Sequence, residues 1–278
     1  AVPPGVVTNI SIVIDATLLP GMVDGDTVLV TTDGVTSNIR IIYTTPIITS
    51  AIKNVPAGGD ITITGTNFDS VVPADTFVVF AGTGIGALTL TRAQIIAVAP
   101  GAVTPTSIIV DATLLPGLAD GDTATVSADA LSSNTRMVYT TPVITSSIKD
   151  IPAAGDITIT GTDLDSVVIT DTLVTFAGGG IGPLVKTQAQ IVAVPPGAVT
   201  STSIVIDATL LPGLADGDTT RVTADALVSN TRMVYTRPVV LSAIRDVPAA
   251  GDLTLTGTNF NSVVATDTYV TFAGGGIG

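Results

Sequence analysis

Apolar and polar residues alternate over short stretches of this chain, and one such stretch occurs three times. Gly155–Thr162 reads GDITITGT, and the same or nearly the same string stands at Gly59–Thr66 and Gly251–Thr258. Within it Ile or Leu alternates with Thr, a period of two residues that indicates a strand with one buried face and one exposed face. The pattern therefore predicts a strand in each of the three copies.

The stretch between residues 142 and 235 carries further apolar runs, each bounded by Gly, Pro or Asp. We expect strands at Val143–Ile148, Ile157–Gly161, Leu173–Ala177, Lys186–Val194, Ser203–Ala208, Thr220–Ala226 and Thr231–Tyr235. No window predicts an amphipathic helix. About seven short strands separated by turn residues are typical of an immunoglobulin-like sandwich, so the expected fold class is all-β, built from tandem sandwiches.

The repeat has a period of about 96 residues, and residues 97–182 are roughly three-quarters identical to residues 193–278, which indicates tandem duplication. This register predicts a C-terminal half-repeat at 1–43, complete repeats at 44–139 and 140–235, and an N-terminal half-repeat at 236–278. Two positions of one strand do not change between copies, and we expect them in the core. They are Val78, Val174 and Val270, and Phe80, Phe176 and Phe272.

Composition excludes several classes of function. All 23 acidic residues are Asp, and the chain has no His, Cys, Glu or Trp, which excludes Ser-His-Asp and Cys-His catalytic sets. We therefore expect no enzymatic activity, no cofactor, and no catalytic, cofactor-binding or metal-binding residues.

A net charge of −13 argues against a nucleic-acid partner. No apolar run is long enough to span a membrane, and we expect an extracellular or cell-surface protein.

Several segments in this register carry a family resemblance. They are Pro142, Ile144, Ile148, Gly155–Thr162, Val174–Gly178, Gln190–Gly197 and Ser229–Tyr235. In this order they resemble the IPT/TIG family of immunoglobulin-like domains, over essentially the whole chain. The resemblance implies a fold rather than an activity, because the shared residues belong to strands and turns. The chain lacks the basic loops of DNA-binding members and is most similar to the repeat arrays of secreted microbial surface proteins.

Two repeated motifs are candidates for chemistry. The string Asp-Gly-Asp-Thr carries the carboxylate pairs Asp24/Asp26, Asp120/Asp122 and Asp216/Asp218. Paired carboxylates are ligands that Ca²⁺ accepts, but no distal Glu completes a calcium loop, and Asp-Gly favours a tight turn. We interpret these strings as turns and leave Ca²⁺ binding to a calorimetric titration. The glycine-rich segments at 81–86, 177–182 and 273–278 lack the following helix of a phosphate-binding loop, so we interpret them as loops.

Two further residues invite a covalent role. Lys149 stands where some surface domains form a Lys–Asn cross-link, but its counterparts are Lys53 and Arg245, and Arg cannot form that bond. We therefore expect surface lysines. Asn9-Ile10-Ser11 fits the N-glycosylation pattern, which the other copies lack.

The joints between repeats are short. Tyr43–Pro46, Tyr139–Pro142 and Tyr235–Pro238 contain no Gly/Ser spacer, which predicts repeats stacked as a stiff rod. The two terminal half-repeats are complementary. Either the chain is an excerpt of a longer array, or the C-terminal half of one copy is completed by the N-terminal half of the next, because unpaired strand edges are templates for strand addition.

We therefore expect a structural extracellular repeat protein that forms a stalk, fibre or filament, with head-to-tail copies of the same chain as its partner. Completion between copies is heterologous, so it would propagate into a filament. The alternative is an adhesin array whose loops bind a glycan or surface receptor, with repeated copies adding avidity.

Overall fold

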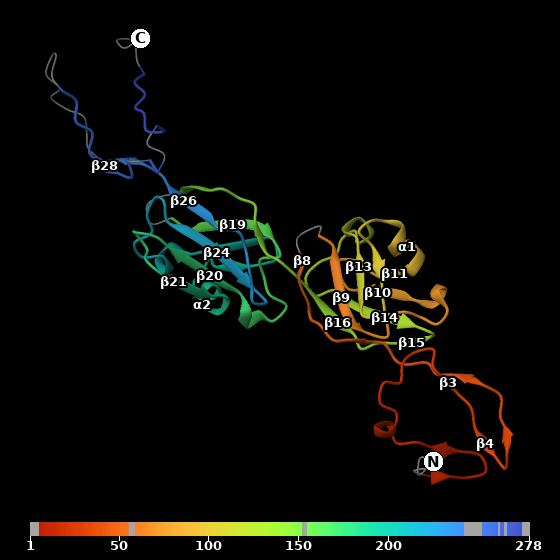
Figure 1. Ribbon diagram of the computed structural model, residues 1–278. Coiled ribbons are helices and arrows are strands. Elements are labelled where there is room, and N and C mark those ends of the chain that lie inside the picture. The colour runs from red at the N-terminus through yellow and green to blue at the C-terminus, as the bar shows by residue number, and fades with distance from the viewer. Residues whose placement is uncertain are drawn as a thin grey trace. The chain divides into compact units, whose positions relative to one another are not determined.

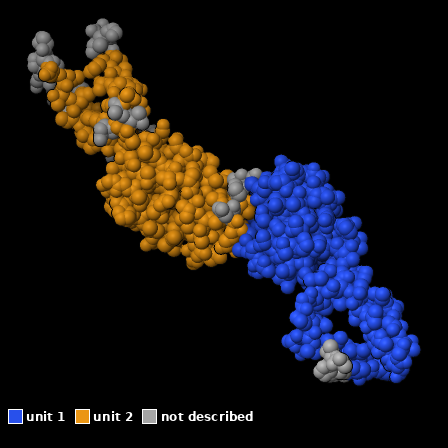
Figure 2. Space-filling view, viewed as in Figure 1, with its two compact units in different colours: residues 1–52, 58–138 blue, residues 53–57, 139–278 orange. Residues whose placement is uncertain are grey.

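A computed structural model describes residues 6–55, 59–151, 155–241, 252–260, 262–263 and 266–273. These residues form mainly short strands, and the predicted all-β fold class is confirmed (Figure 1). Contacts divide the chain into two compact units, residues 1–52 with 58–138 and residues 53–57 with 139–278 (Figure 2). No helix among the described residues is long and apolar enough to cross a membrane.

The first complete repeat is a two-sheet sandwich. One sheet has the order β12-β13-β9-β7 and the other the order β11-β10-β14-β16-β8, with β15 at the edge of β14. The bounds are β7 Ile47–Ile48, β8 Ile52–Val55, β9 Ile61–Thr66, β10 Phe77–Ala81, β11 Leu88–Thr91, β12 Ala102–Val103, β13 Ser107–Val110, β14 Thr123–Ala128, β15 Leu131–Ser132 and β16 Arg136–Thr140.

The second complete repeat has the same topology, with sheets β17-β19-β23-β22 and β18-β26-β24-β20-β21 and with β25 at the edge of β24. Its strands are β17 Val143–Ile144, β18 Ile148–Ile151, β19 Ile157–Thr162, β20 Leu173–Ala177, β21 Leu184–Thr187, β22 Ala198–Val199, β23 Ser203–Ile206, β24 Thr219–Ala224, β25 Leu227–Val228 and β26 Arg232–Thr236. The single strand predicted over 143–148 is wrong, because the chain moves from one sheet to the other between β17 and β18.

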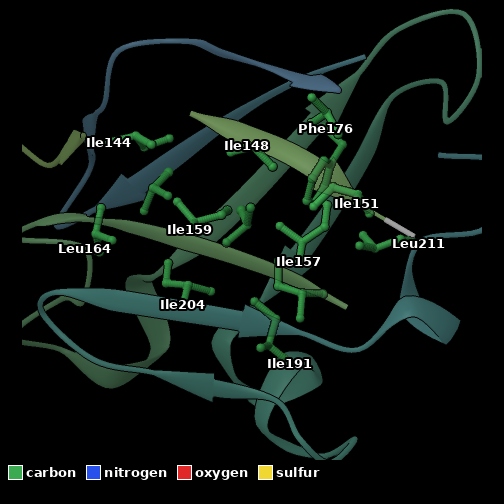
Figure 3. Close-up of a cluster of buried hydrophobic side chains, with 14 residues drawn as sticks. Ile144, Ile148, Ile151, Ile157, Ile159, Leu164, Phe176, Ile191, Ile204 and Leu211 are labelled. Carbon is green, nitrogen blue, oxygen red and sulfur yellow. The ribbon is translucent and has the colours of Figure 1, made fainter. Parts of the chain in front are cut away.

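The core of the second repeat lies between its two sheets. Ile157 and Ile159 of β19 are fully buried while Thr158 and Thr160, which alternate with them, are exposed, as the alternation predicts. From the facing sheet, Val174 and Phe176 of β20 pack into the same cluster (Figure 3). At about 25 cal/mol per Å² of buried apolar surface, such a cluster supplies the main stabilisation of a small sandwich.

The strand predicted over Lys186–Val194 is wrong from Gln188 onward. β21 ends at Thr187 and helix α2 spans Gln188–Val192, just as helix α1 spans Arg92–Ala97 in the first repeat. Thr187 caps α2 by accepting from the Gln190 N–H, and the Gln190 side chain accepts from the Thr187 N–H. This capping box is readable in the sequence as Thr-x-x-Gln and starts the helix despite its short length.

Smaller elements complete the description. The 3-10 helices are Ala16–Leu18, Pro73–Asp75, Ala112–Leu114, Ile169–Asp171 and Ala208–Leu210. The N-terminal half-repeat contains β1 Val6–Val7, β2 Ile12–Val13, β3 Thr27–Val28, β4 Thr31–Thr32, β5 Val35–Thr36 and β6 Arg40–Ile41. The C-terminal half-repeat contains β27 Val239–Val240 and β28 Gly257–Thr258. These strands pair only in twos, so neither terminal half forms a sandwich in the described structure.

Candidate assembly surfaces

The N-terminal half-repeat presents an apolar face that the complete repeats bury. Ile12 in β2 is 44 % exposed, whereas Ile108 at the same position of β13 is 0 % exposed. Val28 and Val30 are also exposed, while Ala124 and Val126 of β14 are buried. Figure 1 shows this half as an open loop of short strands, in red and orange. The half therefore carries core side chains without the sheets that would cover them.

The C-terminal half-repeat is open in the complementary way. Phe272 is 50 % exposed and Phe176 at the same position of the second repeat is 0 % exposed, and Val270 differs from Val174 in the same sense. The open side forms a hollow of about 740 Å³ whose lining includes Pro238, Val240, Leu253, Leu255, Phe260 and Val270. The lining also contains polar residues, among them Asp216, Asn259 and Asp267, so the hollow is apolar only in part.

The complete repeats show what normally joins the two halves. In the first repeat, β13 pairs with β9, with Ile108 opposite Ile63, and β14 pairs with β10, with Val126 opposite Val78. β9 and β10 come from the first half of the repeat, and β13 and β14 from the second half. The N-terminal half-repeat carries the equivalents of β13 and β14, and the C-terminal half-repeat the equivalents of β9 and β10.

A side-chain clamp reinforces this union. The Asn134 Oδ1 accepts from the Ile48 N–H at 2.8 Å, and its Nδ2 donates to the Ile48 carbonyl at 3.1 Å. The Nε of Arg136 donates to the same carbonyl at 3.3 Å. In the second repeat Asn230 and Arg232 hold Ile144 in the same way, so the clamp is a repeated feature. Ser-Asn-x-Arg recurs in each copy, but residue order alone does not show which main chain its side chains contact.

The Asp-Gly-Asp turn and the glycine loop are parts of one structure. The buried Asp122 carboxylate accepts from the N–H groups of Gly84 at 3.1 Å, Ile85 at 2.9 Å and Ala119 at 2.9 Å. A Cβ added at Gly82 would lie 1.9 Å from Oδ1 of Asp122, so the loop needs glycine there. Asp218 accepts three equivalent bonds, from the N–H groups of Gly180, Ile181 and Ala215.

In the N-terminal half-repeat the corresponding Asp26 is exposed. Of the three carboxylate bonds that Asp122 accepts, Asp26 accepts only the equivalent of the Ala119 bond, from the Val23 N–H at 2.9 Å, among the described residues. The glycines that would complete it stand at 274–276, outside the described residues, where the sequence repeats that of 178–180. The central Gly121 has φ of 84°, which fits the interpretation of the string as a turn.

A third tie between halves starts at Asp129. Its carboxylate accepts from the Ser70 hydroxyl and, at 3.1 Å, from the Val71 N–H. Asp225 does the same with the Val167 N–H at 3.0 Å. The equivalent residue in the N-terminal half is Asp33, which is exposed. In the complete repeats, therefore, the Asn134–Arg136 clamp and the carboxylates of Asp122 and Asp129 are among the polar contacts that cross from one half to the other.

The first Asp of each turn has a different place, at the joint. Asp24 accepts from the Thr44 N–H at 2.7 Å, and Asp216 accepts from the Thr236 N–H at 3.0 Å. Burial at the joint, together with the nearby Asp129 carboxylate, raises the pKa of Asp24. Burial also disfavours ionised Asp129, but the bonds from Ser70 and Val71 outweigh it and its pKa is lowered. As the pH falls, Asp24 therefore takes up a proton before Asp129 does.

The remaining candidates have ordinary surroundings. The Nζ of Lys149 lies 5.1 Å from the centroid of the Tyr235 ring, and that of Lys53 lies 4.7 Å from the Tyr139 ring, both cation–π contacts. Arg245 lies outside the described residues. Asn9 is exposed. No group of three or more Asp side chains among the described residues is arranged to hold a metal ion.

Comparison with known proteins identifies one domain. A comparison with curated protein sequences gives no match. Among solved structures, the Bacteroides ovatus mixed-linkage glucan utilization locus protein SGBP-B, in complex with a mixed-linkage heptasaccharide, is 15% identical with a TM-score of 0.25. That match covers 79% of this chain and 54% of the other, so the chain spans about half of that protein's length.

The FN1–FN3 domains of chicken CNTN1 are 8% identical with a TM-score of 0.20, over 74% of this chain and 71% of theirs. The family model of the IPT/TIG domain matches residues 46–126, from just before β7 into β14. The resemblance predicted from the strand and turn residues is thereby confirmed for the first complete repeat, whose residues 46–126 match the model of the IPT/TIG domain.

Proposed function

We propose that this chain is a structural repeat protein, extracellular or on the cell surface, in which the terminal half-repeats of two copies combine into one complete repeat. The observation that supports the proposal is a matched pair of exposed faces. Positions such as Ile12 and Phe272, which are exposed at the two ends, are fully buried as Ile108 and Phe176 in the complete repeats.

The complete repeats supply the expected geometry. The segment around β2 of one copy pairs with the segment around Leu253–Leu255 of the next, as β13 pairs with β9. This is strand addition in which main-chain hydrogen bonds give affinity and the alternate side chains fill the core. Because the two surfaces differ, each added copy presents a new open end, and association continues as a filament.

The mechanical role follows from repetition. Each repeat buries its own core, and the number of repeats sets the length of the array. Exposed β-strand faces rich in Thr and nearly free of Lys lack the charges that commonly prevent contact between sheets, which suits a protein that assembles. The adhesin array stays a prediction of the sequence, to be tested on a glycan array.

The first experiment compares two polypeptides by sedimentation velocity over a range of micromolar concentrations. Residues 1–278 are expected to form a concentration-dependent series of oligomers. Residues 44–238, which keep both complete repeats and lack both halves, are expected to sediment as a monomer. A monodisperse monomer for residues 1–278 would overturn the proposal, as would equal association of the shorter chain.

Engineered disulfides test the strand register of the proposed contact between two copies. Ile109 lies opposite Thr62 on the outer face of the first repeat, and the same two positions in the terminal halves are Val13 and Thr254. Opposite residues of antiparallel strands are close enough for a disulfide, and the chain has no native Cys. The variant Val13→Cys/Thr254→Cys is expected to give a ladder of covalent oligomers on a non-reducing gel, whereas Val13→Cys/Thr256→Cys is expected to give far less.

A further inference from the structure

We propose that Asn38 and Arg40 form a clamp on β27 of a second copy, at Val240. β27 is the first strand of the C-terminal half-repeat, and the clamp sets the register in which the copies join. The inference deepens the proposed function and rests on it. It assigns to two exposed polar residues the recognition of a partner main chain, and it names the segment that they recognise.

The complete repeats show the clamp in its closed state. Each Asn uses both atoms of its amide on the N–H and C=O of a single residue, at 2.8 and 3.1 Å on Ile48 and at 2.8 and 3.0 Å on Ile144. The Arg Nε adds a bond to the same carbonyl, at 3.3 Å on Ile48 and 3.0 Å on Ile144. The clamp and its target are separated by 86 and 88 residues along the chain, so it joins one half of a repeat to the other.

The target strand needs such a partner. β7 is only two residues long, and Ile48 is fully buried. A buried main-chain amide without a partner is costly, so the polar groups of Ile48 that do not pair with β9 must be satisfied from the other side. The Asn amide supplies a donor and an acceptor in one plane, as a neighbouring strand would.

In the N-terminal half-repeat the backbone around Asn38 has the same local hydrogen bonds as the backbone around Asn134. Ser37 accepts from the Val30 N–H at 2.9 Å and donates to the Asn38 carbonyl at 3.0 Å. Ser133 makes the same two bonds beside Asn134, at 2.9 and 2.8 Å. The local backbone around Asn38 therefore already has the hydrogen bonds of the closed clamp. Among the described residues, the side chains of Asn38 and Arg40 have no hydrogen-bond partner.

The C-terminal half-repeat holds the target ready. β27 pairs with β28 so that Val240 lies opposite Gly257, as Ile48 lies opposite Gly65 in the first repeat. Val240 is 54 % exposed, which leaves this strand accessible. At Asn38 and at Val240 the local hydrogen bonds and strand pairing of the closed clamp are thus present before the copies meet, so these two sites need little ordering on association.

The chemistry of the clamp explains what it selects. Its three bonds reach main-chain atoms alone, so Ile48, Ile144 and Val240 serve equally in spite of their different side chains. A strand shifted by one residue would turn its N–H and C=O groups to the opposite side and its apolar residues to solvent. The clamp thus accepts the first strand of any repeat of this chain, in one register.

The test uses residues 1–278 carrying Asn38→Ala/Arg40→Ala, and the same change in the chain with Val13→Cys/Thr254→Cys. Loss of three bonds to otherwise buried main-chain groups is expected to raise the dissociation constant at least tenfold and to weaken the disulfide ladder. Arg40→Lys, which keeps a donor, is expected to fall between the double variant and the unmodified chain. The melting temperature of the complete repeats should not change. Asn38 and Arg40 lie in the N-terminal half-repeat, and among the described residues their side chains form no hydrogen bond with the complete repeats.

A matched control is Asn134→Ala, which opens the clamp inside the first repeat. It is expected to lower the melting temperature of that repeat and to leave the dissociation constant unchanged. If the Asn38→Ala/Arg40→Ala chain associates as tightly as the unmodified chain, the clamp is wrong and the proposed head-to-tail contact stands. If the unmodified chain is a monomer, both proposals are overturned together.

Discussion

The N-terminal half-repeat and the first complete repeat contain corresponding residues in two different states. Local contacts are the same in both. Asp15 accepts from the Thr17 N–H at 2.8 Å, as Asp111 accepts from the Thr113 N–H at 2.8 Å. Strands differ, however, because β14 spans Thr123–Ala128 whereas the same stretch of the half-repeat forms only the two-residue strands β3 and β4.

The C-terminal half shows the same contrast. The GDITITGT stretch forms the six-residue strands β9 and β19 in the complete repeats but only β28, of two residues, in its third copy. Hydrogen bonds between residues a few positions apart form from local sequence, whereas a strand reaches full length only when partners lie on both sides. The comparison therefore separates what a half can organise alone from what needs its other half.

The largest expected effect is on stability, and it is expected at Phe176 but not at the equivalent Phe272. Phe176→Ala removes a fully buried side chain and is expected to cost about 3–5 kcal/mol of the free energy of unfolding of the second repeat, measured by denaturant titration of residues 44–238. Phe272→Ala in residues 1–278 is expected to leave that free energy unchanged and to weaken association. A comparable loss of repeat stability from Phe272→Ala would show that the two positions are not equivalent in the way proposed.

A smaller effect is expected at the anchor of the glycine loop. Asp122→Ala leaves three main-chain N–H groups without their acceptor and is expected to cost about 1–3 kcal/mol in the first repeat. Asp26→Ala, at the equivalent position of the half-repeat, is expected to leave the melting temperature unchanged and to weaken association. Equal melting temperatures for Asp122→Ala and the unmodified chain would mean that the loop does not depend on this carboxylate.

The smallest expected effect concerns the joint. The raised pKa of Asp24 means that its ionisation destabilises the folded joint, a cost that is relieved as the pH falls through the folded-state pKa, above the usual 3.8. The lowered pKa of Asp129 acts oppositely, and its contribution is lost as the pH falls through its folded-state value, below 3.8. Between these two values Asp24 is protonated and Asp129 is ionised.

Asp24→Asn keeps the oxygen that accepts from Thr44 and adds an N–H that can donate to Asp129. We expect it to stabilise the joint at pH 7 by less than about 1 kcal/mol, and the gain to shrink as the pH is lowered toward the pKa of Asp24. Hydrogen exchange of the Thr44 amide at several pH values measures this. The charge-matched control Asp75→Asn, at an exposed carboxylate, should show no such gain, and a gain independent of pH would contradict the account of the pair.

Much of the sandwich could be predicted from the alternation of residues. The strand around Ile157 lies where apolar residues recur at every second position, and the strand around Ser203 contains the continuous apolar run Ile204–Ile206. Val174 and Phe176 are buried as expected, whereas the prediction that Val270 and Phe272 lie in the core is wrong, because the C-terminal half-repeat leaves both exposed. Helix α2 was missed because its short apolar run resembles a strand, and only the Thr187–Gln190 capping box distinguishes the two. The clamp was missed because Asn134 and Ile48 are 86 residues apart, a distance over which a single sequence shows no pairing.

By itself the sequence determined the repeat, the all-β class and the IPT/TIG resemblance, because all of these are properties of residue order. Only the tertiary structure decided what the polar motifs do. It brought the Asp-Gly-Asp turn against the glycine loop, and it placed Asn134 and Arg136 on the main chain of Ile48. The reason is physical: an Asp or Asn side chain serves equally well in a local turn or a distant hydrogen bond, and the packing of the two sheets selects which main-chain groups come within reach.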